Sequence, residues 1–438
     1  MRDSGSWRNW AGNQAVTGID VRHPAGTDQL VTAVCEAVAA GRRVRPLGNG
    51  HSFSAIGRPD DVAVALDRHA ELVGVTGSGL VTVQAGMPLH RLTAELAARG
   101  WALDNLGDID RQTVAGALST GTHGTGARRG ILSTQLRGLE LVTADGSVLR
   151  CSPDQHPDVF SAARVGLGAL GVLSTVTLQA VPAFALRAEE GPMRLPELLE
   201  RFEEFMTSTD HVEFYWFPHT DRTLTKRNTR VPLADGLDPL PRWRALRDDE
   251  VLANGAFGAL LALGWVVPPL VPPLARVGAR ALGPRRWTDR SDRVFVSRPR
   301  VHFRETEYAL PRAAAPGVLA ELDRAVRTSG WRVPFPVEVR LVAADDIPLS
   351  PASGRDSAYV AVHVPAWTGP NAYVDTFEAI ATAAGGRPHW GKLHAQHAGS
   401  LAATYPRFGE FRAVRRRLDP TGVFTSAHLD RVLGPVTA

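Results

Sequence analysis

The chain has 438 residues, which is more than one ordinary domain holds and enough for two. Hydrophobic residues make up 44% and charged residues 21%, a balance that excludes a disordered chain and indicates sizeable cores. The net charge is only +4, and the arginine cluster near the end has no aromatic residues interleaved with it, so no nucleic-acid partner is expected. That cluster is interpreted as a solvated helix face and comprises Arg412, Arg415, Arg416 and Arg417.

Roughly the first 180 residues alternate predicted helices and strands. Residues 27–40 place Leu30, Val34 and Val38 on one face, and Gly41 follows, so a helix ending there is expected. The further elements expected in this part are strands over 44–47, 62–66 and 80–85, a helix over 88–99, a hairpin of 139–143 and 147–151 around Asp145-Gly146, a helix over 160–167 and a strand over 172–181.

Beyond Pro182 the composition shifts toward aromatic residues and longer strands. Strands are expected over 211–217, 294–297, 337–343 and 359–364, with helices near 195–207, 315–328 and 373–384. This order favours an α+β domain with one antiparallel sheet.

Cysteine usage and the first residues favour a reducing compartment. Cys35 and Cys151 lie far apart and have no metal-ligand spacing, and MRDSGSWRNW lacks the apolar run of a signal peptide. We therefore expect a cytoplasmic protein. One stretch, 256–275, is strongly apolar, but four prolines interrupt it, so it does not predict a spanning helix. An element of the second domain is the favoured interpretation, and peripheral attachment to a membrane surface or a partner is the alternative.

The first candidate binding motif is the turn Gly48-Asn49-Gly50-His51-Ser52-Phe53, which follows a predicted strand. Glycines there let backbone N–H groups converge on an anion such as a pyrophosphate. His51 projects from a tight loop, where its imidazole could act as a nucleophile. Taken alone, such a turn is more often only a turn.

A second run of small and hydroxyl residues spans 116–126, with His123 as its one bulky polar side chain. Such a segment suits close backbone approach to a large ligand, and two such runs favour a dinucleotide over a single phosphate. By contrast, Gly166 to Gly171 spells G-x-G-x-x-G but leaves a predicted helix and enters a strand, the reverse of a Rossmann turn. We therefore reject nicotinamide binding there, although contact with the adenine end of a cofactor stays open.

Charged residues stand out at two places in the second half of the chain. Alternation along the strand places Glu338 and Arg340 on the same face, where they could bind a polyol, although the pattern alone favours a surface ion pair. Lys392 is one of only two lysines, the other being Lys226, and in an arginine-rich chain a lysine marks a place that needs a small ammonium group.

The histidines around Lys392 invite a metal interpretation. His394 and His397 could share a helical face near His389. No carboxylate follows at ligand spacing and no cysteine lies nearby, so no metal site is predicted.

Together these motifs resemble a known family. RPLGNGHSF at 45–53 and THGTG at 122–126 resemble the FAD-binding domain of the vanillyl-alcohol-oxidase superfamily. EVR at 338–340 and HWGK at 389–392 are similar to the sugar-1,4-lactone oxidases, which include gulonolactone, arabinonolactone and alditol oxidases. The resemblance covers nearly the whole chain. It implies an α+β, two-domain flavoprotein: a PCMH-type FAD-binding domain over 1–182, a cap domain with an antiparallel sheet over 183–420, and a C-terminal segment over 421–438 that returns to the FAD domain.

The resemblance also implies roles for single residues. His51 would bond covalently to the flavin 8α-methyl group, while Glu338, Arg340 and Lys392 would be catalytic and would bind substrate together with Asp108 and His363. The remaining cofactor contacts that it implies are Gly48, Asn49, Gly50, Ser52, Phe53, Gly107, Asp108, Gly116, Ser119, Thr120, Thr122, His123, Gly124, Gly126, Gly171 and Val172. Gly107 stands where plant-type dehydrogenases carry an alanine thought to obstruct oxygen, and so permits an oxidase.

The implied activity is FAD-dependent oxidation of L-gulono- or D-arabinono-1,4-lactone at C2 to an ascorbate-like product. Oxygen or another electron acceptor would reoxidise the flavin. An alditol oxidase on the same scaffold is the alternative, although Asp108 replaces the serine of those enzymes and His363 replaces a threonine. A non-catalytic flavin-binding protein is the alternative from another class. The natural substrate, the acceptor and the oligomeric state stay open.

Overall fold

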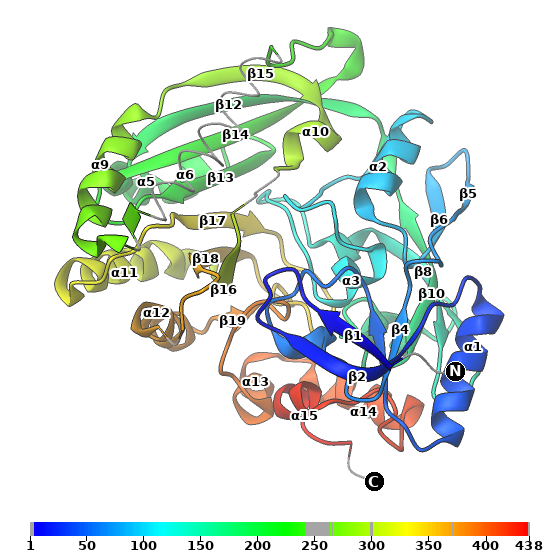
Figure 1. Cartoon of the computed structure of the whole chain (residues 1–438). Helices are drawn as coiled ribbons and strands as arrows, with labels where there is room; N and C mark the ends of the chain where they lie inside the picture. The colour runs from blue at the N-terminus through cyan, green and yellow to red at the C-terminus, as the bar shows by residue number, and fades with distance from the viewer. Residues whose placement is uncertain (1–3, 242–262, 265, 298–300, 370, 437–438) are drawn as a thin grey trace.

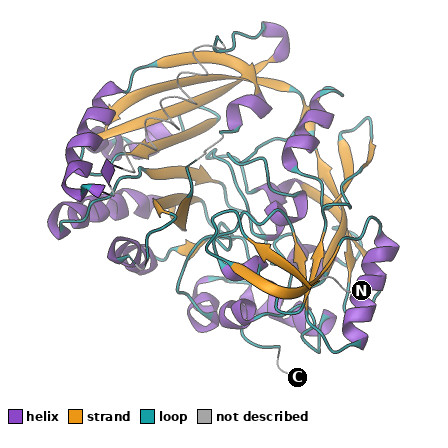
Figure 2. Cartoon of the chain, in the orientation of Figure 1, coloured by secondary structure: helices purple, strands orange, loops and turns teal. Residues whose placement is uncertain are grey.

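The structure, a computed structural model, describes residues 4–241, 263–264, 266–297, 301–369 and 371–436. Within these residues the chain forms two regions, one built on two smaller sheets and the other on a single large sheet (Figure 1). Figure 2 shows the strands gathered into separate sheets with the helices around them. The α+β fold expected from the sequence is therefore confirmed.

The first sheet has four strands in the order β1-β2-β4-β3. β1 and β2 are antiparallel, whereas β4 runs parallel to both β2 and β3. The helix α1 connects β2 to β3. The segment is helical because its Leu30, Val34 and Ala37 form one fully buried apolar face, and it ends at Gly41, which has φ +64°. The bounds are β1 Ser4–Arg8, β2 Ala15–Arg22, α1 Thr27–Ala39, β3 Val44–Leu47 and β4 Val62–Ala65.

The second sheet is antiparallel, with the strand order β5-β6-β10-β8-β9. The predicted hairpin is confirmed: Gly146 has φ +81°, and the Asp145 carboxylate accepts from the backbone N–H of Ser147 at 3.0 Å. Two short strands, β7 Trp101–Ala102 and β11 Val181–Pro182, pair separately. The other bounds are β5 Leu72–Val75, β6 Leu80–Gln84, α2 Leu89–Ala97, α3 Val114–Ser119, β8 Leu136–Val142, β9 Val148–Cys151 and β10 Val172–Gln179.

The helix expected over 160–167 begins and ends earlier than predicted. It is α4, Pro157–Ala163, because a proline starts its first turn and the chain takes positive φ at Leu167 and Gly168. The glycine-rich segment that follows leads into β10. The segment therefore leaves a helix and enters a strand, as expected, which is the reverse of the order in a Rossmann turn.

The large sheet has eight antiparallel strands in the order β15-β12-β14-β13-β17-β18-β16-β19. Val337, Val339 and Leu341 of β17 pack in one core with Leu319 of α11 and Phe377 of α12. The alternate residues of β17 therefore face away from these helices. The bounds are β12 Phe184–Arg194, α5 Leu195–Glu200, α6 Phe202–Met206, β13 His211–Trp216, β14 Arg222–Pro232, α9 Val271–Ala281, β15 Arg285–Arg290, α10 Ser291–Phe295, β16 Phe303–Pro311, α11 Ala315–Ser329, β17 Val337–Val342, β18 Ser357–Pro365, α12 Ala372–Ala383 and β19 Arg387–Pro388.

The prediction of a strand over 294–297 was wrong. Val294 and Phe295 lie in the short helix α10 and are buried, and an apolar run this short does not distinguish a helix from a strand. Strands β12, β14, β15 and β16 were not predicted. They carry many charged residues, which weakens an alternating apolar pattern.

The last part of the chain returns to the first region. Trp390, Tyr405, Phe411, Phe424 and Leu433 are buried in the same core as α1 and β10. Helix α14 packs on α4 of the first region, and Figure 1 shows α13–α15 gathered together at the lower edge of the view. This packing favours a returning segment that begins near residue 390, earlier than the 421 expected. The three helices are α13 Ala398–Thr404, α14 Phe408–Leu418 and α15 Ala427–Leu433.

The arginine cluster on α14 is not uniformly solvated as expected. Arg415 is only 2% exposed, and its guanidinium donates to the carbonyl of Gly434 at 2.8 Å and to Oγ1 of Thr425 at 2.9 Å. Arg417 forms an ion pair with Asp158. The correction follows from the helix periodicity, which turns Arg415 toward the core together with Phe411.

The apolar stretch 256–275 lies in part outside the described residues. From 266 onward it contributes to α9, whose Val277 is 64% exposed. Among the residues that the structure describes, no helix has the length and apolar character needed to cross a membrane.

Candidate active site

Two adjoining cavities share the loop after β3, the larger lying where the two regions meet and the narrower lying within the first region. The larger has a volume of about 1320 Å³ and is lined by loops of the first region and by strands of the large sheet. The narrower has a volume of about 100 Å³ and lies beside the loop that follows β3. Both are lined by His51, Ser52, Gln112 and Thr120, so one elongated ligand can extend from one cavity into the other.

Small residues form the wall of the narrow cavity. A Cβ atom on Gly48 would lie 2.4 Å from Oγ1 of Thr113, and Gly50 has φ +68°. Side chains are excluded at these points, so the backbone is open to a ligand, as anion binding by N–H groups requires. The predicted cofactor residues lining this cavity are Gly48, Asn49, Gly50, His51, Ser52, Gly116, Ser119, Thr120 and Gly171.

The His51 loop is held from both ends of the chain. The Asn9 side chain donates to the carbonyl of Ser52 at 2.9 Å. The backbone N–H of Phe53 donates to the carbonyl of Gly391 at 2.7 Å. The N-terminal Asn-Trp and the HWGK segment, which lie far apart in sequence, therefore fix the loop that carries His51.

His51 lies at the junction of the two cavities, with its ring 6.2 Å from that of Trp10 in a stacked orientation. Burial lowers the pKa of His51, and the positive charges of Lys392 and Arg111 lower it further. The imidazole is therefore neutral at neutral pH and keeps a lone pair on one ring nitrogen.

Arg340 is the centre of a buried charge network on the wall of the larger cavity. Its Nε donates to Glu213 at 2.8 Å, and its Nη2 contacts both Asp108 and Glu338. The Lys226 ammonium lies 3.3 Å from Glu213 on the far side. Three carboxylates thus share two cations, and one negative charge is left over if every group is ionised.

The network divides its carboxylates into two kinds. Burial would raise the pKa of Glu213, but the attraction of Lys226 and Arg340 is stronger and lowers it to about 2. Burial raises the pKa of Glu338 to about 8 against the attraction of Arg340, and repulsion from Asp108 adds to the rise. Burial also raises the pKa of Asp108, against the attraction of Arg340. Glu338, with a pKa of about 8, is the carboxylate that we assign to proton exchange near neutral pH.

Lys392 lies on another wall of the same cavity. Its Nζ is 2.5 Å from Oε2 of Glu305 and 5.2 Å from the centre of the Phe53 ring. Burial would lower the pKa of Lys392, but Glu305 and Glu307 outweigh burial and raise it, so the ammonium stays charged. Burial lowers the pKa of His363, whose Nδ1 lies 3.2 Å from the carbonyl of Pro336.

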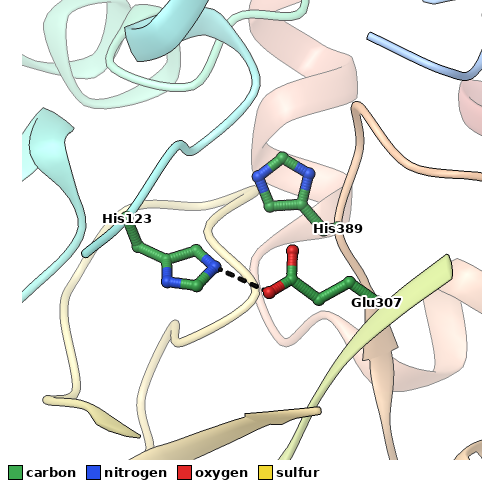
Figure 3. A group of neighbouring side chains, drawn as sticks. All are labelled: His123, Glu307 and His389. Atoms are coloured by element: carbon green, nitrogen blue, oxygen red, sulfur yellow. Dashed lines mark hydrogen bonds and ion pairs between the residues drawn. The ribbon is translucent and has the colours of Figure 1, made fainter. Parts of the chain in front are cut away.

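His123, Glu307 and His389 form a second buried cluster, drawn in Figure 3. Nδ1 of His123 is 2.9 Å from the carbonyl of Gly124 and must donate, because a carbonyl only accepts. Nε2 lies 3.1 Å from Oε1 of Glu307, whose pKa is lowered by His123 against the effect of burial. Both ring nitrogens of His123 therefore lie against hydrogen-bond acceptors. Nδ1 of His389 accepts from the N–H of Gly391 at 3.1 Å, and burial lowers the pKa of this residue to about 3.

Comparison with known protein families accounts for both regions. The FAD binding domain family matches residues 21–152, and the D-arabinono-1,4-lactone oxidase family matches residues 176–432. The chain belongs to the sugar-lactone oxidase family. As a member it is an FAD-dependent enzyme of the lactone oxidase and dehydrogenase class.

Relatives in this family align along nearly their whole length. The chain is 39% identical to the L-gulono-1,4-lactone dehydrogenase of Mycobacterium tuberculosis, over 98% of this chain and 99% of that protein. It is 33% identical to the L-gulonolactone oxidase of Bos taurus and 33% identical to the alditol oxidase of a Streptomyces species, each over 97% of this chain and 98% of the relative. Among solved structures, cholesterol oxidase from B. sterolicum superimposes with a TM-score of 0.82 at 18% identity, over 99% of this chain and 97% of that one, which shows a shared fold.

The larger cavity of this chain brings together most of the residues that the sequence predicted to contact substrate and flavin. Those that line it are His51, Ser52, Phe53, Gly107, Asp108, Thr120, Thr122, His123, Glu338, Arg340, His363 and Lys392. Three predicted cofactor residues line neither of the two cavities. A Cβ on Gly124 would lie 2.3 Å from the carbonyl oxygen of Leu106, Gly126 donates to the carbonyl of Leu341 at 2.8 Å, and Val172 pairs with Val142 inside the sheet. The structure gives these three residues packing roles.

Sequence reasoning missed the partners of the predicted cations. Glu213 lies within a strand that was predicted, and a glutamate among buried apolar residues was the available signal. Lys226 had been noted only for the rarity of lysine. Glu305 and Glu307 lie on β16, which was not predicted, so nothing marked them.

Proposed function

We propose that this enzyme oxidises an aldono-1,4-lactone, L-gulono- or D-arabinono-1,4-lactone, at C2, to a ketone that enolises to an ascorbate-like product. The supporting observation is that Glu338, Arg340 and Lys392 line one cavity that also contains His51. An ammonium, a guanidinium and a protonatable carboxylate suit a compact ligand that carries several hydroxyl groups and a ring carbonyl. The names of the relatives from Mycobacterium tuberculosis and Bos taurus support the same substrate class.

The two cavities fit FAD. The glycine-lined narrow cavity suits the ADP half, and the larger one has room for the ring system and a sugar lactone. We place the flavin ring beside Gly107 and His51. When bound, FAD supplies the acceptor for the hydride that leaves C2.

The side chains around the larger cavity position the substrate and accept its proton. Arg340 and Lys392 hold the oxygen atoms of the substrate, and each is itself positioned by a buried glutamate, Glu213 and Glu305 respectively. Glu338 takes the proton of the C2 hydroxyl, which its raised pKa permits. No further base is required among these residues.

Turnover of purified holoenzyme separates this proposal from its alternative. We expect L-gulono- or D-arabinono-1,4-lactone to reduce the flavin anaerobically and xylitol to reduce it at least 100-fold more slowly. The reverse order would overturn the lactone proposal and favour an alditol oxidase, which the 33% identical Streptomyces relative supports. The same reduced enzyme, mixed with oxygen or with a dye, tests which acceptor it accepts.

We further propose that His51 is bonded covalently to the flavin. A neutral imidazole at the junction of the cavities is a competent nucleophile, and the residues that follow it, Ser52 and Phe53, are held by Asn9 and by Gly391.

Acid precipitation of the protein tests this bond. We expect the yellow colour to stay in the pellet for the native enzyme and to move to the supernatant for His51→Ala. Colour in the supernatant for the native enzyme would overturn the covalent bond and leave FAD binding intact.

A further inference from the structure

Arg45, on β3, is a buried cation with incomplete hydrogen bonding. It is 4% exposed, and one of its nitrogens, Nη2, donates to the carbonyl of Leu167. The atoms Nε and Nη1 are buried and have no partner in the described part of the chain. Leaving two donors of a charged group unsatisfied is costly, so such an arrangement needs a compensating partner.

The described part of the chain offers Arg45 no ion-pair partner. Asp60 attracts it only from beyond ion-pair distance, and the repulsion from Arg415 is the larger of the two effects. Burial, together with this repulsion, lowers the pKa of Arg45 to about 10, so the guanidinium is still charged at neutral pH. Arg415 is a useful contrast, because it is similarly buried and its Nε also lacks a partner, but both of its Nη atoms donate, to Gly434 and to Thr425, and the Asp430 carboxylate lies 3.7 Å away.

The position of Arg45 indicates what the missing partner is. It lines the narrow cavity, together with the open backbone of Gly48 to His51. A Cβ atom on Gly168 would lie 2.4 Å from its Nη2, so a glycine at that position leaves room for the guanidinium at the cavity wall. Strand β3 thus carries Arg45 to the same cavity as the glycine turn that directly follows it.

We propose that Arg45 is a cofactor-binding residue whose two unpartnered N–H groups donate to the diphosphate of the ADP half of FAD. A guanidinium supplies planar, charged donors suited to phosphate oxygens, which complement the neutral backbone donors of the glycine turn. The proposal rests on FAD binding, which the family shows, and not on the lactone substrate or the covalent bond.

The test compares Arg45→Met and Arg45→Lys with Arg415→Met in a His51→Ala background, so that the flavin can be removed and returned. FAD affinity is measured from the quenching of flavin fluorescence, and ADP and adenosine are titrated as competitors. The melting temperature of each apoprotein is measured in parallel. The Arg415 variant serves as the control because it removes a buried arginine whose two Nη atoms already donate within the protein.

We expect Arg45→Met to weaken FAD and ADP binding by about 10- to 100-fold and adenosine binding far less, with Arg45→Lys intermediate. Its apoprotein should melt at the same temperature or higher, because an uncompensated buried charge has been removed. Arg415→Met should instead lower the melting temperature and leave ADP affinity unchanged. A destabilised Arg45→Met apoprotein with unchanged ADP affinity would overturn the proposal, and so would equal losses for ADP and adenosine.

Discussion

Glu338 is the residue on which the proton chemistry of the proposed reaction depends. It faces the larger cavity from β17, beside Arg340, and burial raises its pKa to about 8. A base must be ionised to accept a proton, and with a pKa of about 8 the ionised fraction of Glu338 rises through the neutral range, is one half near pH 8 and is nearly complete about one unit higher. Flavin reduction is therefore expected to speed up with rising pH and to level off above the pKa.

Glu338→Gln should lower the rate of anaerobic flavin reduction by about 100- to 10,000-fold, because the amide cannot take the hydroxyl proton. It should also abolish the rise of the rate with pH. Stopped-flow measurements between pH 6 and pH 9 check both, with flavin content as the control for folding. A variant that keeps the native pH profile would show that another group accepts the proton.

At the scale of elements, strand β17 carries apolar side chains on one face and charged side chains on the other. The apolar residues of β17 pack against α11 and α12, while Glu338 and Arg340 on its other face reach the cavity. Strand β3 ends in the glycine turn, and the turn is held by the backbone of the HWGK segment. The shape of the narrow cavity therefore depends on the two glycines of that turn, Gly48 and Gly50.

Gly48→Ala tests this dependence. Its methyl group would lie 2.4 Å from Oγ1 of Thr113, which also accepts from the N–H of Gly116 and so caps α3. We expect FAD retention to fall by about tenfold or more, because either the loop or the helix cap must move. Gly74→Ala, where nothing lies within 4 Å, is the matched control and should retain FAD normally. Equal FAD content in the two purified variants would show that FAD binding does not depend on a glycine at position 48.

At the scale of the whole molecule, the C-terminal segment completes the core of the FAD region. Phe424 is fully buried there, among residues contributed by both ends of the chain. The cofactor region therefore cannot form a complete core before the last helices are in place. Folding of the two regions is expected to be coupled.

Phe424→Ala should lower the free energy of unfolding by about 3–5 kcal/mol, since it leaves a cavity in this core. Loss of flavin binding and loss of secondary structure should still occur together in denaturant. Circular dichroism and flavin fluorescence, followed on the same samples, check this, with Val148→Ala on an exposed strand as the control. Two separated transitions would show that the regions unfold independently.

Much of the site could be predicted from short stretches of sequence, because the backbone conformation of a turn or strand depends mainly on neighbouring residues. The glycine turn at 48–51, the small-residue run at 116–126 and the alternation of Glu338 with Arg340 each follow from a few neighbouring residues. The hairpin at Asp145-Gly146 and the helix ending at Gly41 were predictable for the same reason. Strands rich in charge, such as β14 and β16, were not, because their polar residues are satisfied by partners that lie far away in sequence.

The pairing of charges depended on tertiary structure. Glu213 meets Arg340 and Lys226 from a neighbouring strand, and Glu307 meets His123 across the boundary between the regions. No spacing along the chain encodes these contacts, since each needs strand order and register to bring distant carboxylates within hydrogen-bonding distance. The protonation states follow from the same contacts, because burial and neighbouring charge set the pKa of a group. Local motifs were therefore enough to favour a dinucleotide, and their resemblance to a known family implied the cofactor and the chemistry. Folding decided which charged groups meet and which carboxylates have raised pKa values.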